Sequence, residues 1–287
     1  MNGSNPASGN TPPEPLRVRQ LSHGFQTPDG STATIFDRLD FTVGHGEIVS
    51  IVGRSGAGKS TLFNLVSGLL TPQAGDISVG RRADGEAGRI AYMLQKDLMM
   101  PWRTVLQNAL LGIELYRKVG PDDIARARQM LGRYGLGAVA DAWPHSLSGG
   151  MRQRVALTRT LLVDPTLVLL DEPFSALDYE TRLALEDDII ALRAQSGTSV
   201  VLVTHDIEEA IAMSDRVILL GGRPARIEDQ IDIELTTHGP RNAVSAREAP
   251  EFRGYHARVW AGLRGHVTSR SANETAQSRP LAGAIHD

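Results

Sequence analysis

Cysteine is absent from this 287-residue chain, which excludes disulfides, thiolate metal sites and cysteine nucleophiles and fits a reducing compartment. An excess of positive charge is also lacking. The 30 Lys and Arg residues stand against 33 Asp and Glu, a formal net charge of −3 that argues against general nucleic-acid binding. With 41% hydrophobic residues the chain can still bury a core, so we expect one large domain or one domain with an appendage.

Long apolar runs are missing as well. No stretch approaches the roughly 18–20 apolar residues that cross a bilayer, and the best run, Leu161 to Leu170, is broken by Asp164 and Pro165. The polar, Pro-rich residues 1–15 contain no apolar signal-peptide core and are predicted to be a flexible leader. We therefore expect a chain that reaches a membrane only by docking on another protein.

Residues 16–240 alternate strand-like and helix-like segments, the pattern of an α/β domain. The Val, Ile and Leu content of the strand candidates suits strands buried on both faces. These candidates are Ile48–Val52, Leu167–Leu170, Val200–Val203 and Val217–Leu220. Two amphipathic helices are predicted from apolar residues three and four apart, Leu62, Leu65, Val66 and Leu69 in one and Leu185, Ile189 and Leu192 in the other.

The segment from about Lys96 to His145 lacks buried-strand runs. Pro121 opens a predicted helix there, with Ile124, Ala127 and Leu131 on one face. We place a helical subdomain at about 96–160, inserted in the α/β domain.

Residues 241–287 are predicted to form a helix from Pro250 to about Leu263 and a polar tail. With seven Arg against four acidic residues, this part is either solvated or docks on a partner or anionic lipid.

A phosphate-binding loop is the sharpest motif. Gly53–Thr61 satisfies G-x-x-x-x-G-K-[ST] between a predicted strand and a predicted helix. Its glycines let backbone N–H groups point inward at phosphate oxygens, and the helix start adds its positive dipole end. Lys59 supplies a charge to the β- and γ-phosphates, and the Ser60 hydroxyl can bind Mg²⁺.

Two adjacent acids end the strand that starts at Leu167. Buried carboxylates are costly unless they face a cation or a charged substrate. In a phosphate-loop protein Asp171 holds Mg²⁺, and Glu172 is placed to orient or deprotonate the attacking water.

A second anion site is predicted at Leu147–Arg154, where Ser148 and two glycines open a helix. Two phosphate-binding helix starts are redundant in one chain. They make sense if the second closes over another subunit's nucleotide.

The segment Leu147–Gln153 matches the LSGGxxQ signature, and the chain resembles the ATP-binding subunits of ABC transporters over about Leu16 to Arg241. The resemblance implies a P-loop NTPase ABC cassette, with a RecA-like core, the inserted helical subdomain and an antiparallel β subdomain. By the same resemblance Gln95 is the Q-loop glutamine, Ser175–Asp178 the D-loop, and His205 the switch histidine. Phe25 is the best candidate for the aromatic residue that stacks on adenine. Phe36 and Phe41 are the alternatives, because the alignment is loose there and either could be mistaken for a core residue.

The resemblance and the motifs together give the predicted site. Its catalytic residues are Lys59, Glu172 and His205, and its metal ligands are Ser60, Gln95 and Asp171. The nucleotide-binding residues are Phe25, Gly53, Ser55, Gly56, Gly58, Lys59, Ser60, Thr61, Gln95, Ser148, Gly149, Gly150 and Asp178.

A narrower resemblance covers Leu94–Val105, whose Pro-Trp-Arg-Thr-Val run is similar to the nitrate, sulfonate and taurine branch of bacterial importers; relatives in this branch import thiamine-precursor pyrimidines. Met93 departs from the aromatic residue that many members have there. Met93, Met99 and Met100 are either core residues or an adaptable docking surface for a membrane-subunit helix.

The resemblance implies ATP with Mg²⁺, a homodimer, permease subunits, a solute-binding protein reached through them, and a place on the cytoplasmic face of the plasma membrane. A soluble ABC ATPase acting on DNA or ribosomes is disfavoured, because such proteins usually carry a coiled-coil insertion or two cassettes. An inactive regulatory cassette is disfavoured by the presence of Lys59, Asp171, Glu172 and His205 together. The transported solute and the direction of transport are set by the membrane subunits.

Overall fold

The computed structural model describes residues 14–80 and 88–277. Its strands are β1 (Leu16–Gln26), β2 (Thr32–Val43), β3 (Ile48–Gly53), β4 (Ala74–Val79), β5 (Ile90–Met93), β6 (Leu167–Asp171), β7 (Ser199–Thr204), β8 (Arg216–Gly221) and β9 (Arg226–Asp232). Its α-helices are α1 (Lys59–Val66), α2 (Val105–Glu114), α3 (Pro121–Arg133), α4 (Gly149–Leu161), α5 (Tyr179–Ser196), α6 (Ile207–Met213), α7 (Ala243–Glu248) and α8 (Phe252–Gln277).

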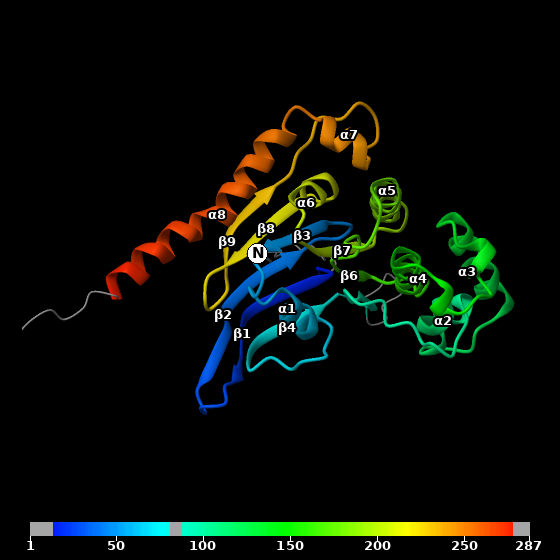
Figure 1. Cartoon of the computed structure of the whole chain (residues 1–287), viewed down its shortest axis with the longest axis horizontal. Coiled ribbons are helices and arrows are strands. Elements are labelled where there is room, and N and C mark those ends of the chain that lie inside the picture. The colour runs from blue at the N-terminus through cyan, green and yellow to red at the C-terminus, as the bar shows by residue number, and fades with distance from the viewer. Residues whose placement is uncertain (1–13, 81–87, 278–287) are drawn as a thin grey trace, which may run out of the picture.

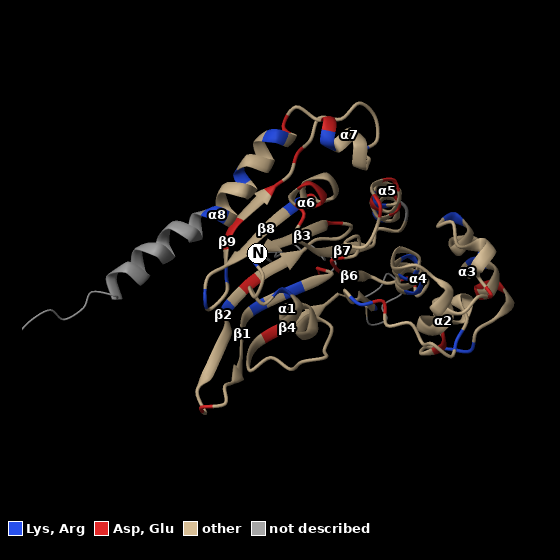
Figure 2. Cartoon of the chain, in the orientation of Figure 1, with Lys and Arg blue, Asp and Glu red and all other residues tan. Residues whose placement is uncertain are grey.

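A six-stranded sheet forms the centre, with strand order β5-β6-β7-β3-β8-β9. The first five strands in this order are parallel, and β9 pairs antiparallel to β8. Every residue of β3, β6 and β7 is buried, because α1 with the strands β1 and β2 covers one face of the sheet and other helices cover the opposite face. The four predicted strands are confirmed, and Figure 2 shows how few charged residues the central strands carry.

A separate three-stranded sheet has the order β2-β1-β4, and both of its pairings are antiparallel. It lies beside α1 in Figure 1 and is the antiparallel β part that the ABC cassette implies. The α/β cassette fold is thereby confirmed.

Helix α1 is shorter than its apolar pattern predicts. Leu62, Leu65 and Val66 are buried as expected, but the helix ends at Val66. Gly68 follows with φ 78°, a left-handed conformation that stops a helix, and Leu69 is 65% exposed. The prediction that Leu69 belongs to the buried face is wrong.

Helices α2, α3 and α4 lie together at one side of the molecule (Figure 1). On α3, Ala127 and Leu131 are buried as predicted, but Ile124 is 39% exposed. The neighbouring Asp123 is buried instead of Ile124. The Asp123 carboxylate accepts a hydrogen bond from the Gly120 N–H at 2.8 Å and so caps the start of the helix.

The C-terminal region differs most from its prediction. A short helix, α7, precedes the expected one, and α8 continues to Gln277 instead of ending near Leu263. Most of the predicted leader (residues 1–13) and the end of the tail (278–287) lie outside the described residues. None of the described helices is long and apolar enough to cross a membrane.

Candidate functional site

The phosphate loop joins β3 to α1, and its glycines are required by close contacts. A Cβ on Gly53 would lie 2.5 Å from the carbonyl oxygen of Leu220. A Cβ on Gly58, which has φ 85°, would lie 2.7 Å from Ile35 Cγ2 and 2.9 Å from Phe36 Cζ. The loop therefore fits its surroundings only without side chains at these positions.

Lys59 is folded over this loop. Its Nζ donates hydrogen bonds to the carbonyl oxygens of Gly53, at 2.7 Å, and Arg54, at 3.1 Å. Burial lowers the pKa of Lys59, and the charges of Glu172 and Asp171 raise it in part. A half-buried ammonium with only neutral oxygens as hydrogen-bond acceptors gains strongly from a phosphate group.

Asp171 ends β6 and is only 6% exposed. Burial raises the pKa of its carboxyl, while hydrogen bonds from Ser60 and Tyr92 and the charge of Lys59 lower it. A buried carboxylate beside a serine hydroxyl suits Mg²⁺, which takes one or two carboxylates and completes its shell with waters and phosphate oxygens. The predicted ligands Asp171 and Ser60 fit that ion.

Tyr92 was missed by the motif analysis. It lies on β5, which pairs with β6 so that Tyr92 is the partner of Leu169, two residues before Asp171. Burial raises the pKa of Tyr92, and Asp171 raises it further, so the phenol stays protonated and donates. An aromatic residue in a strand beside the acidic strand was the only signal for it.

The carboxylate of Glu172 lies next to two other predicted site residues, Gln95 and His205. Its carboxylate accepts a hydrogen bond from Gln95 Nε2 at 2.8 Å, and His205 Nδ1 lies 3.4 Å from its other oxygen. Its backbone has φ 48°, and its N–H donates to the Val203 carbonyl at 2.8 Å. The turn after β6 therefore aims this side chain at the ends of the neighbouring segments.

The second predicted anion site lies at the start of α4. Ser148 is the N-cap, and its hydroxyl accepts a hydrogen bond from the Met151 N–H at 3.3 Å. The cavity beside Gly149 is about 420 Å³; Gln95 and Ser175 line it, but no residue of the phosphate loop does. Within one chain, the two helix starts form separate sites.

An ion pair not found from the sequence connects the segment after Gln95 to α4. Arg152 Nε lies 3.0 Å from the Asp97 carboxylate, and Arg152 Nη1 donates to the Leu147 carbonyl at 2.7 Å. Gln153 Nε2 donates to the carbonyl of Glu172 at 3.2 Å, which joins the same helix to the acidic turn.

Asp178 and Phe25 lie at the edges of the site. The Asp178 carboxylate caps α5 by accepting hydrogen bonds from the N–H and hydroxyl of Thr181, which lower the pKa of Asp178. Phe25 is 43% exposed and packs edge-on against His23, with ring centroids 5.1 Å apart. Phe36 and Phe41 are buried in the core, so Phe25 is the one of the three that can stack on a base.

A glycine loop at a helix start, a buried lysine and an acid pair at a strand end define a P-loop nucleotide-binding protein. The sequence model of the ABC transporter family matches residues 36–175. The chain belongs to this family, as an ATP-binding subunit whose ATP hydrolysis is coupled to transport.

Known relatives agree with this assignment. The chain is 47% identical to the aliphatic sulfonates import ATP-binding protein SsuB 2 of Agrobacterium fabrum, over 77% of this chain and 80% of that protein. It is 37% identical to the nitrate import ATP-binding protein NrtC of Synechococcus elongatus, over 83% of this chain but only 36% of that protein. The dimeric ATP-binding cassette MJ0796, solved with ADP and Pi, matches with a TM-score of 0.68 and 28% identity, over 76% of this chain and 99% of that chain.

Proposed function

We propose that two copies of this chain bind ATP head-to-tail, each nucleotide lying between the phosphate loop of one copy and the start of α4 of the other. The observation that supports this is the separation of the two helix starts within one chain. The phosphate loop has Lys59 and the acid pair beside it. The cavity at the start of α4 is lined instead by Lys96 and by Asp97, which is paired with Arg152, and by no residue of the phosphate loop. The second site is complete only against another copy's nucleotide.

In this arrangement the phosphate loop, Gly53–Thr61, cradles the phosphates, Phe25 stacks on adenine, and Asp178 lies at the junction of the copies. Ser60, Asp171 and Gln95 would hold Mg²⁺, which would supply positive charge to the β- and γ-phosphates. Lys59 offers its ammonium to the same oxygens after leaving the carbonyls of Gly53 and Arg54.

Hydrolysis follows from the groups around Glu172. Its carboxylate accepts a proton from a water that attacks the γ-phosphorus, and the bond to the β,γ-bridging oxygen breaks. Gln95 and His205, which both lie next to this carboxylate, orient the water and the γ-phosphate. Loss of the γ-phosphate removes the charge that joined the two copies, so they separate.

A groove of about 290 Å³ next to α2 supplies the docking site for a permease helix. Met100, Leu98, Leu115 and Tyr116 line it, and the last three are at least half exposed. Met93 is only 2% exposed and belongs to the core, which decides between the two alternatives that its sequence left open. A permease helix in this groove would contact Leu98, and the ion pair of the adjacent Asp97 with Arg152 connects this segment to the start of α4.

The solute class follows from the relatives. SsuB 2 is named for aliphatic sulfonates, and the Pro101–Val105 run points to the same branch. We therefore propose import of a small anionic or polar solute, with this chain on the cytoplasmic face of the plasma membrane. Selectivity then resides in the permease and a solute-binding protein.

Mixed pairs test the head-to-tail site. Lys59→Ala removes the phosphate loop's charge, and Ser148→Arg blocks the start of α4, so each variant alone is expected to lose hydrolysis. In an equimolar mixture, half of the pairs are mixed and carry one intact site, which restores up to roughly a quarter of the wild-type rate. A mixture as inactive as either variant, although both retain their native circular dichroism, would contradict the proposal.

A further inference from the structure

Helix α8 has no role in the proposed mechanism, yet it is firmly attached to the cassette. Val259 is fully buried, and the Tyr255 hydroxyl accepts a hydrogen bond from the Glu234 N–H at 3.1 Å. Gly262 approaches β8 so closely that a Cβ there would lie 2.3 Å from Leu219 Cδ1. The helix therefore has a fixed position along β8, β9 and α6 (Figure 1).

The N-terminal half of this docked helix borders His205 and the first turn of α6. A cavity of about 470 Å³ lies between α8 and the first turn of α6. His205, Asp206 and Glu208 line it on one side, and His256 and Trp260 line it from α8. Because His256 and Trp260 are four residues apart, they lie on the same face of the helix.

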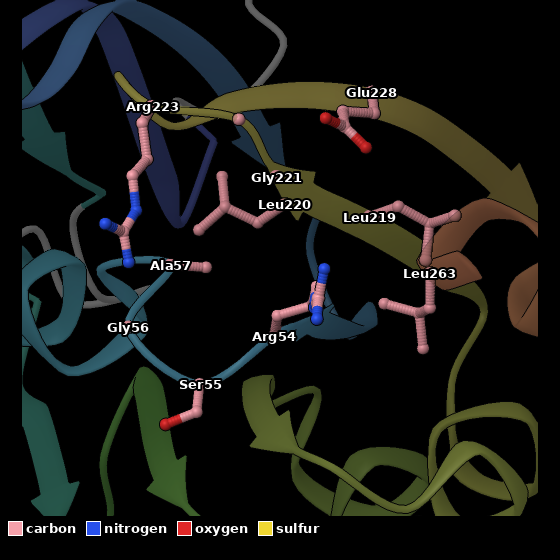
Figure 3. A pocket seen from close by; sticks show the side chains of 11 residues that line it. Arg54, Ser55, Gly56, Ala57, Leu219, Leu220, Gly221, Arg223, Glu228 and Leu263 are labelled. Atoms are coloured by element: carbon pink, nitrogen blue, oxygen red, sulfur yellow. The ribbon is translucent and has the colours of Figure 1, made fainter. Parts of the chain in front are cut away.

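Further along, α8 reaches the outer side of the phosphate loop. A second cavity, of about 310 Å³, is lined by Leu263 of α8, by Arg54–Ala57 of the loop and by Arg223 after β8 (Figure 3). Leu219 and Leu263 lie together at one end of it, Arg223 lies at the opposite end, and Arg54 lies between them. The helix therefore runs from the switch histidine to the phosphate loop.

Trp260 is the prominent residue on this path. It is 47% exposed, and the Arg264 guanidinium lies over its ring, 4.9 Å from the centroid. Tryptophan and arginine are enriched among the residues that contribute most to protein–protein binding, and tryptophan buries a large area with only two side-chain torsions to fix. The indole and His205 line the same cavity, and the His205 side chain is 67% exposed on the face that meets the second copy in the proposed pair.

We propose that Trp260 and Arg264 pack against the second copy of this chain when ATP joins the pair, so that α8 extends the dimer interface beyond the nucleotides. The inference rests on the proposed function, because continuity with the nucleotide face identifies the occupant. In the nucleotide-free chain this surface is exposed, and in the ATP-bound pair it is covered.

Fluorescence tests this contact without changing Trp260. The chain has three tryptophans, so Trp102→Phe with Trp143→Phe, in a Glu172→Gln background that retains ATP, leaves Trp260 as the only emitter. ATP is expected to shift its emission to the blue, and ADP is not. The shift should vanish when Ser148→Arg is added, because this variant binds ATP but cannot pair. No shift, or a shift that survives Ser148→Arg, would overturn the inference.

Gel filtration with ATP in the same Glu172→Gln background measures how much Trp260 contributes to the affinity of the dimer. Trp260→Ala is expected to weaken the ATP-dependent dimer about tenfold, as an interface tryptophan of moderate weight does. Leu69→Ala, at an exposed apolar residue remote from this path, is the control and should have no effect. An unchanged dimer in Trp260→Ala would refute the role of α8 and leave the proposed pair intact. If the Glu172→Gln parent, which retains Trp260, forms no dimer with ATP, both proposals are refuted.

Discussion

The starts of α1 and α4 are two helix N-termini of one chain with opposite surroundings. Around α1, the loop holds a half-buried lysine, and a buried carboxylate and a tyrosine hydroxyl lie beside it. Around α4, the cap is a serine followed by two glycines, and the cavity beside them is lined by Lys96 and by Asp97, which is paired with Arg152, instead of by a pair of adjacent acids. A helix end can bind an anion with its backbone alone, but it cannot catalyse without the additional groups.

In the proposed pair, this difference divides the work between the two copies. The α1 side carries the groups proposed to bind and cleave ATP, and they are costly to bury, since burial lowers the pKa of Lys59 and raises that of Asp171, which favours the neutral form of each. The α4 side carries little cost and remains exposed. We infer that the α4 side adds only a second, distant contact, which makes hydrolysis depend on pairing.

The largest effect is expected on the α1 side. Glu172→Gln keeps the shape of the side chain but cannot accept a proton, so the hydrolysis rate should fall about 10³-fold, within the range for removal of a general base. ATP binding should persist, and the pair should stay closed. Phosphate release and gel filtration with ATP measure both, and ATP-loaded protein that elutes only as monomer would be inconsistent with the division described above.

A smaller effect is expected on the α4 side. Ser148→Ala removes the hydroxyl that caps α4, which costs about 1 kcal/mol of stability, and it removes one donor to the other copy's nucleotide. Hydrolysis at low protein concentration should fall about tenfold through weaker pairing, while single-chain ATP affinity stays within about twofold of wild type. Titration with a fluorescent ATP analogue checks this, and a large loss of affinity would mean that the two helix starts act on the same nucleotide within one chain.

The third effect concerns stability and not turnover, at Glu209 on the helix that follows His205. Burial raises the pKa of Glu209 to about 7, against the opposing hydrogen bond from Thr204 and the charge of Arg182. The folded chain thus retains a proton that the unfolded chain releases above its ordinary pKa of 4.5, so the free energy of unfolding falls as pH rises from 4.5 through 7.

Glu209→Gln, which can still accept the Thr204 hydrogen bond, removes this titration. Its gain in unfolding free energy over the wild type should grow by about 2 kcal/mol between pH 5.5 and pH 8. Urea denaturation at the two pH values measures the difference. Glu208→Gln, at an exposed neighbour on the same turn, serves as the control and should show no such growth.

Periodicity and motifs predicted the centre of this molecule well, because buried parallel strands have near-continuous apolar sequences. Leu167–Leu170 and Val200–Val203 are strands within one residue of their predicted ends. The grouping of Gln95, Glu172 and His205 also followed from motif order, and the structure places their side chains together. The roles of these residues and the domain boundaries remain predictions.

The misses share a physical cause, which is that local sequence does not specify tertiary partners. Leu69 fits the apolar spacing, but Gly68 ends the helix before it. The sequence leaves open whether Met93 is a core or a surface residue. Only the pairing of β5 with β6, in which Leu170 is its partner, shows that it is buried. Tyr92 depends on the same strand pairing, so no one-dimensional pattern could have placed it beside Asp171.

The positive φ of Glu172 sets two demands on one position. A glutamate held at φ 48° carries backbone strain that glycine would not, so glycine is the residue that favours folding there. Glycine cannot accept the proton of the attacking water. A library of variants at position 172 selected for heat resistance alone should therefore drift toward glycine and lose turnover, whereas one selected for transport should return to the acid.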